Sequence, residues 1–390
     1  MTAPLAALLD EAVEARAAPA LAAAVLRDGR LVHLSAHGRL AEGPAGSATW
    51  FDLASLTKPL ATGLSALALA GRGALPLDAP ASRFLPAFRG GGKEAITIEL
   101  LLAHASGLPA WRPYFARAAA DPVAGAAFRG EPSAEAFARG RALVDEAVDA
   151  EPLETRPGQA TRYSDTGYLA LGRIVEAAAA EPLDAFWRRE IASRLGETEA
   201  DFFALPGGPP PPGRPIAATG TARPRPPAPG QEAALAGVAR FEIGPRPGEV
   251  DDDNAFARGG VAGHAGLFGT APAVARLGQA FLEETEGAAR LAPAALARRF
   301  ASPRPGAARG LSWDRPDPAG SSMGSLLGAG PRGAVGHLGF TGCSLWIDLD
   351  ARLVVALLSN RTLAGRASEG VRRLRSRFHD AVARAFGGVD

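Results

Sequence analysis

A serine and a lysine three residues apart, Ser55 and Lys58, are the first pattern in this chain that could support chemistry. Pro59 is tolerated in a first helical turn, and the leucines from Leu60 to Leu67 recur at the spacing of one apolar helix face. Residues three apart lie over the same helix face, so the lysine can reach the serine hydroxyl. A partly desolvated lysine can take the serine proton and create a nucleophile.

The choice of lysine at this position is unusual for the chain. Its other cations are almost all arginines, and Lys58 and Lys93 are its two lysines. Lysine can release its proton near neutral pH, whereas arginine cannot. The Ser-x-x-Lys pattern is nevertheless short and arises by chance in many proteins, so further motifs must support a catalytic interpretation.

Two further motifs follow in order. Tyr163 and Asp165 belong to a Tyr-Ser-Asp sequence, in a chain with three tyrosines. His337 and Gly339 begin the sequence His-Leu-Gly-Phe-Thr-Gly at the head of the C-terminal strand pattern. A glycine at the end of a strand permits close approach to the backbone, and the next N–H could join that of Ser55 in an oxyanion hole.

With these motifs in this order, the chain resembles the serine β-lactamase and penicillin-binding protein family, on the class C side that includes related esterases and D-aminopeptidases. The resemblance extends from the first helix to the last strand, and the ordered set is far more specific than any single motif. It rests on the segments Ser55–Lys58, Leu101–Pro109, Tyr163–Asp165, Gly263–Gly266 and His337–Gly339.

The resemblance implies a role for each matching residue. Ser55 is similar to the acylated nucleophile, Lys58 to its proton acceptor, and Tyr163 to the tyrosine that hydrogen-bonds both and moves protons. His337 stands where many relatives have the lysine of Lys-Thr-Gly. The N–H groups of Phe340 and Ser55 correspond to the oxyanion hole.

Two positions depart from the family pattern. Asp165 replaces a common asparagine, and a carboxylate cannot donate to a substrate carbonyl. If it touches Lys58, Asp165 would also keep the lysine charged. Leu338 replaces a threonine whose hydroxyl could hold a substrate carboxylate. Both changes favour a small neutral ester or amide as substrate, which predicts an esterase-like serine hydrolase working through an acyl-enzyme.

Several alternatives remain open at this point. The activity could be that of a β-lactamase, a D-Ala-D-Ala carboxypeptidase or a D-aminopeptidase, or the chain could be a catalytically silent binding relative. A metallo-hydrolase is a weaker alternative because the histidines lack paired-ligand spacing. Tyr163 could be an ordinary half-buried tyrosine and His337 a strand-end histidine. His264 could contact either substrate or its own loop, and His104 more simply closes its helix end.

Composition limits the classes of partner. The chain has 390 residues, 47% hydrophobic and 21% charged, with a formal net charge of +1, so nothing indicates a nucleic-acid partner. We expect no cofactor, no metal and no membrane-spanning segment. The single cysteine, Cys343, cannot form an intrachain disulfide and looks like a small core residue. The N-terminus lacks a secretory pattern, which predicts a cytoplasmic protein.

The elements that position these motifs can also be predicted. An amphipathic helix begins the chain, and strands at 21–26 and 31–37 flank an Asp28-Gly29 turn. Three strands, 333–338, 343–349 and 353–358, precede a final helix. The expected fold is α+β and β-lactamase/transpeptidase-like: one antiparallel sheet from both termini, flanked by helices, with an inserted mainly helical domain.

We expect the sheet domain to comprise residues 1–74 and 241–390 and to carry the nucleophile helix and the third motif. The mainly helical domain would comprise 75–240 and carry the Tyr-Ser-Asp motif. Within it, the segment 206–229 is dense in proline and glycine. We predict that this segment forms no regular element and crosses the surface in an extended conformation.

Overall fold

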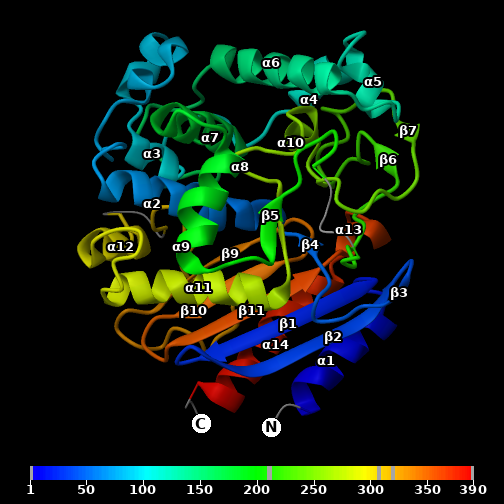
Figure 1. Cartoon of the computed structure of the whole chain (residues 1–390), viewed down its shortest axis with the longest axis vertical. Helices are drawn as coiled ribbons and strands as arrows, with labels where there is room; N and C mark the ends of the chain where they lie inside the picture. The colour runs from blue at the N-terminus through cyan, green and yellow to red at the C-terminus, as the bar shows by residue number, and fades with distance from the viewer. Residues whose placement is uncertain (1–2, 209–212, 305–308, 318–320, 388–390) are drawn as a thin grey trace.

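A six-stranded antiparallel sheet built from both ends of the chain forms the base of the molecule (Figure 1). The computed structural model describes residues 3–208, 213–304, 309–317 and 321–387. The strand order is β3-β2-β1-β11-β10-β9. Its strands are β1 (Ala20–Arg27), β2 (Arg30–Leu40), β3 (Gly43–Pro44), β9 (Ala334–Leu338), β10 (Ser344–Asp348) and β11 (Leu353–Ser359).

The first hairpin joins the C-terminal strands directly, as predicted. Asp28 and Gly29 form its turn with φ values of 51° and 75°, the left-handed conformation that suits a two-residue hairpin. β1 pairs along its length with β11, from Leu21 opposite Ser359 to Arg27 opposite Leu353. The last strands of the chain therefore hold the first two in register.

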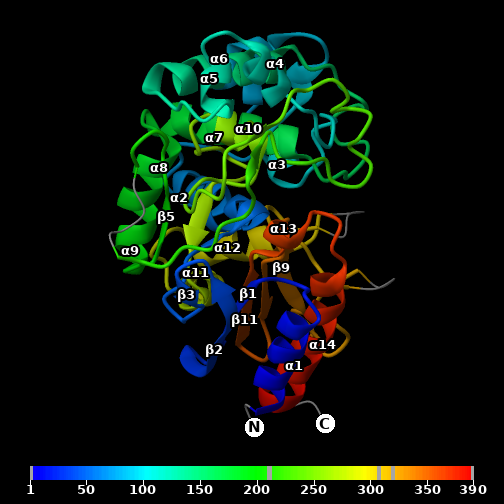
Figure 2. The same cartoon turned by 90° about the vertical axis from the view of Figure 1, so that its right-hand side faces the viewer.

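Helices cover both faces of this sheet. α1 (Ala3–Glu14) and α14 (Gly370–Phe386) lie side by side on one face, and α11 (Ala271–Glu286) lies on the other (Figure 2). Leu21, Ala23 and Val25 of β1 belong to the cluster under α1 and α14, whereas the alternate residues face the main core. Because successive strand residues point to opposite faces, one strand serves both layers.

The remaining helices gather above the sheet (Figure 1). Thr97 caps α3, accepting a hydrogen bond from the Leu100 N–H as expected, and Ser164 caps α7 in the same way. The helices are α2 (Leu64–Gly71), α3 (Ile98–Leu102), α4 (Phe115–Ala120), α5 (Gly125–Phe128), α6 (Ala134–Ala150), α7 (Asp165–Ala179), α8 (Leu183–Phe186), α9 (Ser193–Leu195), α10 (Asp253–Ala257), α12 (Ala294–Ala301) and α13 (Arg361–Ala364).

The prediction for segment 206–229 is wrong in two respects. Ala222 and Arg223 form a short strand, β6, which pairs with β7 (Phe241–Glu242). Much of the described part of the segment is also buried rather than at the surface. The fully buried Arg223 pairs with Asp253 at 2.8 Å and lies 3.9 Å from the Phe256 ring centroid. Composition cannot reveal this burial, because the partners lie about thirty residues further along the chain.

A second, three-stranded sheet leads into the site. Its order is β4-β8-β5, comprising Phe51–Asp52, Leu267–Gly269 and Ala200–Phe202. The proposed domain boundary near residue 240 stays a prediction, as does the cytoplasmic location; α10, beyond that boundary, packs against α4 and α6. No helix in the described part of the chain is both long and apolar enough to cross a bilayer.

Gly172 tests how the helical layer is held against the site. A Cβ at Gly172 on α7 would lie 2.7 Å from the Gly263 Cα, in the loop that precedes His264. We expect Gly172→Ala to lower the free energy of unfolding by about 1–3 kcal/mol through overpacking. A Cβ at Gly46 would meet nothing within 4 Å, so Gly46→Ala is the matched control. Equal denaturation midpoints for the two variants would contradict this account.

Candidate active site

Ser55 lies at a strained junction between a strand and a helix. It is the middle residue of a short 3₁₀ turn, Ala54–Leu56, which continues through a π-helical stretch, Lys58–Gly63, into α2. Ala54 has a left-handed φ of 48°, an uncommon conformation for a residue with a side chain. Strain of this kind and π-helical turns both concentrate at functional sites.

Lys58 is fully buried and contacts three groups. Its Nζ donates to the Ser55 Oγ at 2.9 Å and to the His264 carbonyl at 3.1 Å. The same nitrogen lies 2.7 Å from the Asp165 Oδ1. The sequence predicted the contact with Ser55. Because Asp165 replaces the asparagine that is common in the family, Lys58 here has a carboxylate beside it. A buried ammonium needs such partners, because leaving water without them costs several kcal/mol.

Tyr163 completes this cluster. Its ring centroid lies 4.8 Å from the Lys58 Nζ, and the Ser55 side chain is close enough to influence the pKa of its phenol. Burial, followed by the nearby Asp165 carboxylate, raises the pKa of Tyr163 well above its usual value of 10. The phenol therefore stays protonated at neutral pH, and its O–H can donate or relay a proton.

His104 closes the end of α3 as predicted, but the sequence did not predict that it also contacts the Tyr-Ser-Asp motif. It follows α3 with a φ of 55°, but its ring also lies 4.7 Å from the ring centroids of both Tyr163 and Tyr168. Its Nδ1 accepts a hydrogen bond from the Ser164 N–H at 3.0 Å. Burial lowers the pKa of His104 well below its usual value, so it remains a neutral acceptor. His104 thus orients the Tyr-Ser-Asp motif.

The third motif lines the opposite wall of the site. The Nδ1–H of His337 donates to the Leu338 carbonyl at 2.8 Å. Nε2 is then unprotonated, and it has no hydrogen-bond partner among the described residues. Burial, and then the charges of Lys58 and Arg309, lower the pKa of His337 to about 4 although Asp314 opposes this. At neutral pH His337 is therefore uncharged, and its single N–H is already used.

Gly339 permits close contact between this motif and the nucleophile turn. A Cβ at Gly339 would lie 2.6 Å from the Leu53 carbonyl oxygen. The sequence predicted that a substrate would approach this glycine closely, whereas in the structure it is the backbone of Leu53 that does so. The N–H groups of Ser55 and Phe340 have no hydrogen-bond acceptor among the residues that the structure describes. Two unpaired donors beside the Ser55 hydroxyl are what an oxyanion hole requires.

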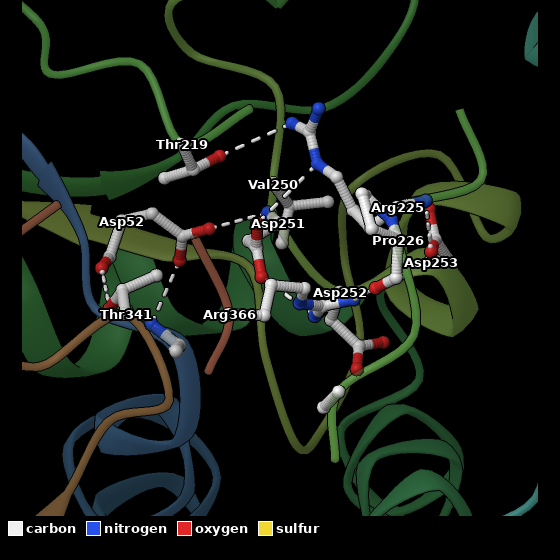
Figure 3. Close-up of polar contacts among 12 residues, drawn as sticks. Asp52, Thr219, Arg225, Pro226, Val250, Asp251, Asp252, Asp253, Thr341 and Arg366 are labelled. Atoms are coloured by element: carbon white, nitrogen blue, oxygen red, sulfur yellow. Dashed lines mark hydrogen bonds and ion pairs between the residues drawn. The ribbon is translucent and has the colours of Figure 1, made fainter. Parts of the chain in front are cut away.

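Asp52 braces the segments that meet behind this wall (Figure 3). Its carboxylate accepts hydrogen bonds from the N–H groups of Ala54 and Asp251, and its carbonyl accepts from the Thr341 hydroxyl at 2.7 Å. Burial and the nearby Asp251 raise the pKa of Asp52 to about 7. Through its side chain and its carbonyl, one residue therefore connects the nucleophile turn, the Asp251 segment and the third motif.

The His264 side chain contacts Asp252, which precedes α10, and not the loop of His264 itself. Its Nε2 lies 2.8 Å from the Asp252 Oδ1, while its carbonyl holds Lys58. Burial opposes ionisation of Asp252, but the interactions of this carboxyl with His264, the Ala255 N–H and Arg366 together outweigh burial and lower its pKa. His264 also lines the cavity, so the structure gives it a structural contact and access to the substrate space.

Ser55, Tyr163 and His337 open onto a cavity of about 590 Å³. Asp165, Gly339 and Phe340 also line it, so the structure brings every predicted site residue except the buried Lys58 to its wall. The sequence did not identify the arginines that surround it, because none belongs to a recognised motif. These are Arg309, Arg361, Arg366, Arg372 and Arg375. Within the described residues, no three histidine, cysteine or acidic side chains cluster as metal ligands.

Comparison with known proteins identifies the family. A sequence model of the Beta-lactamase family matches residues 5–377. The chain belongs to the beta-lactamase family. It is 32% identical to a putative D-alanyl-D-alanine carboxypeptidase of Escherichia coli K12, over 88% of this chain and 78% of that one. It is 30% identical to an N-acetylmuramyl-L-alanine amidase of Bacillus subtilis 168, over 88% and 77% respectively.

Solved structures agree with this fold. EstCE1, described as a hydrolase with promiscuous acyltransferase activity, aligns with a TM-score of 0.66 at 20% identity, covering 95% of this chain and 97% of EstCE1. The predicted α+β, β-lactamase/transpeptidase-like fold is therefore confirmed. So is the predicted class of enzyme, a serine hydrolase of a family that acts on small amide, ester or β-lactam substrates.

The neutral, buried His337 generates a pH prediction for this family member. The folded chain resists protonating His337 until about pH 4, whereas the unfolded chain protonates it near 6.5. Stability should therefore fall as pH drops through this window, by about 1.4 kcal/mol per pH unit for one proton. The free energy of unfolding can be measured by urea titration at pH 7 and at pH 4.5. Between these two pH values, we expect this free energy to fall by about 2–3 kcal/mol less in His337→Gln than in wild type. Equal losses would show that His337 is not held neutral.

Proposed function

We propose that Ser55 attacks a small ester or amide and forms an acyl-enzyme that water then hydrolyses. One observation carries this proposal: the fully buried Lys58 contacts the Ser55 hydroxyl at 2.9 Å, at a cavity also lined by Phe340, and the N–H groups of Ser55 and Phe340 have no acceptor in the described part of the chain. Nucleophile, proton acceptor and oxyanion donors are the parts that acyl transfer needs.

The contacts of Lys58 suggest a route for its protons. Lys58 must be neutral to accept the Ser55 proton, and the Asp165 carboxylate lies 2.7 Å away to receive the proton that Lys58 gives up. This transfer leaves the buried Lys58 and the partly exposed Asp165 uncharged. The Ser55 Oγ then bonds to the acyl carbon as its proton moves to Lys58.

Tyr163 connects the nucleophile to the leaving group. Its protonated hydroxyl belongs to the same cluster as Ser55 and Lys58, so it can donate a proton to the departing alcohol or amine and recover one from Lys58. Hydrolysis of the acyl-enzyme reverses the route, with water in place of the leaving group. The N–H groups of Ser55 and Phe340 would hold the negative oxygen in both tetrahedral intermediates.

The third motif favours a neutral acyl donor. Leu338 offers no hydroxyl, and the neutral His337 donates its N–H to a backbone carbonyl instead of to a substrate. A substrate carboxylate placed there would lose water without gaining a donor, which is costly. Short neutral esters are therefore the substrates that this wall accepts best.

A second candidate is hydrolysis of a carboxylate-bearing D-alanyl peptide. Arg361 lines the cavity, and no carboxylate lies within ion-pair distance of it among the described residues. Its guanidinium could receive a substrate carboxylate away from the third motif. The name of the Escherichia coli relative, a putative D-alanyl-D-alanine carboxypeptidase, supports the same candidate.

The two lysines of the chain give a matched test of the proton acceptor. Arginine keeps the charge of Lys58 but cannot release its proton. We expect Lys58→Arg to lower kcat for p-nitrophenyl acetate about 10²–10⁴-fold, the usual worth of a general base. Lys93 is also buried but donates to the Asp149 carbonyl, so Lys93→Arg should retain near wild-type kcat. Similar kcat values for the two variants would exclude Lys58 as the base.

A substrate panel separates the two candidate functions. We expect kcat/KM for p-nitrophenyl acetate to exceed that for nitrocefin and for diacetyl-lysyl-D-alanyl-D-alanine. Arg361→Met should lower kcat/KM for the two carboxylate-bearing compounds by a larger factor than for the neutral ester. Faster turnover of nitrocefin or of the peptide by wild type would replace the esterase assignment with the β-lactamase or carboxypeptidase one.

A further inference from the structure

Arg375, on α14, lies directly behind the third motif. Its side chain donates to the carbonyl oxygens of Gly339 at 3.0 Å, Gly342 at 3.3 Å and Cys343 at 2.8 Å. The residue is 6% exposed. Among the residues that the structure describes, no carboxylate lies within ion-pair distance of it.

A buried guanidinium without a carboxylate is an expensive structural choice. Burial lowers the pKa of Arg375 to about 10, which reports the cost of keeping the charge in this position. The same chain pairs its buried Arg223 with Asp253. At Arg375, uncharged carbonyls take the place of such a carboxylate, so its positive charge is not cancelled locally.

The carbonyl of Gly339 and the N–H of Phe340 belong to one peptide unit. A peptide unit is planar and trans, so its C=O and N–H point in opposite directions. A donor that fixes the Gly339 carbonyl from behind therefore fixes the direction of the Phe340 N–H. A charge-assisted hydrogen bond to the carbonyl also polarises the amide and strengthens its N–H as a donor.

The 339–343 turn has other anchors besides Arg375. The Ser359 hydroxyl donates to the Thr341 carbonyl at 2.7 Å, and the Thr341 hydroxyl donates to the Asp52 carbonyl at the same distance. The Phe340 ring lies 4.9 Å from the Arg361 guanidinium and 4.7 Å from that of Arg366. Holding the turn in place therefore does not require a buried cation at Arg375, and its position behind the Phe340 amide needs another explanation.

We infer that Arg375 is a positioning residue for the oxyanion hole, one that orients and polarises the Gly339–Phe340 peptide so that its N–H binds the developing oxyanion. This inference rests on the proposed acyl-enzyme function of Ser55. Arg375 acts through the peptide unit without touching the reacting atoms. Its contribution should therefore grow as charge develops on the acyl oxygen and be small for substrate binding.

Arg375→Met and Arg375→Lys test this role, with Arg377→Met as the control. Arg377 lies on the same helix but is exposed and pairs with Glu11. With p-nitrophenyl acetate, and rates normalised to the fraction of sites labelled by a fluorophosphonate, we expect Arg375→Met to lower kcat about 10- to 100-fold. That is less than the 10²–10³ lost when an oxyanion donor is removed. KM should change less than about threefold, because only transition-state binding is lost.

Two further measurements separate orientation from structural support. The Ki of an alkyl trifluoromethyl ketone, which forms a tetrahedral oxyanion, should rise by the same factor as kcat falls. The infrared stretching frequency of the acyl carbonyl in a slowly hydrolysed acyl-enzyme should shift upward, because weaker hydrogen bonding leaves the C=O bond stronger. Arg375→Lys, which keeps the charge but loses the planar fork, should give intermediate values.

The outcomes are distinguishable. A fall in the labelled fraction with unchanged kcat per site, unchanged Ki and unchanged carbonyl frequency would show that Arg375 only supports the fold. A rise in KM without loss of kcat would also overturn the inference. If Arg375→Met does not fold, the frequency and Ki of Arg375→Lys decide in the same way. Failure of the proposed function would appear instead in the wild type, as turnover without labelling of Ser55.

Discussion

The buried ammonium of Lys58 is the constraint on which the rest of the structure depends. A charge with no exposed surface must find its solvation inside the protein, and here a serine hydroxyl, a carboxylate and a backbone carbonyl supply it. These three groups come from different parts of the chain: the Ser55 turn, the start of α7 and the loop at His264. The fold must bring them together within hydrogen-bond distance, and it does so with close backbone packing.

Small residues and shared braces provide that packing. Gly172 on α7 and Gly263 pack so closely that a Cβ at Gly172 would lie 2.7 Å from the Gly263 Cα. The next residue, His264, places its carbonyl within hydrogen-bond distance of Lys58. On the sheet side, Gly339 allows β9 to approach the Leu53 carbonyl, and Asp52 joins the nucleophile turn to the third motif. Strand β9 of the large sheet thus leads to Phe340, one of the proposed oxyanion donors, and the Ser55 turn carries the other, whereas the helical layer presents Tyr163 and Asp165.

The sequence predicted the parts of this arrangement that depend on local pattern. Helical spacing after Ser55, the Asp28-Gly29 turn and the three C-terminal strand patterns each correspond to observed elements. Motif order indicated which residues would meet, whereas the contact between Lys58 and Asp165 was considered from the sequence only as a condition and is an observation of the structure. The pairing of a buried charge with residues far along the chain could not be predicted in this way. Arg223 is buried in a segment that looks like a surface crossing because Asp253 and Phe256 accommodate its charge. His104 and Arg375 act on backbone groups, which no sequence motif records.

The central claim is that Ser55 becomes acylated during turnover. The most direct measurement is intact-mass analysis, with peptide mapping, of wild-type protein mixed with p-nitrophenyl acetate and quenched in acid on the millisecond scale. The account predicts one acetyl group per chain, located on Ser55, that forms before steady state and decays with the rate of turnover. Continued turnover with an unmodified Ser55, or an acetyl group located on another residue, would contradict it.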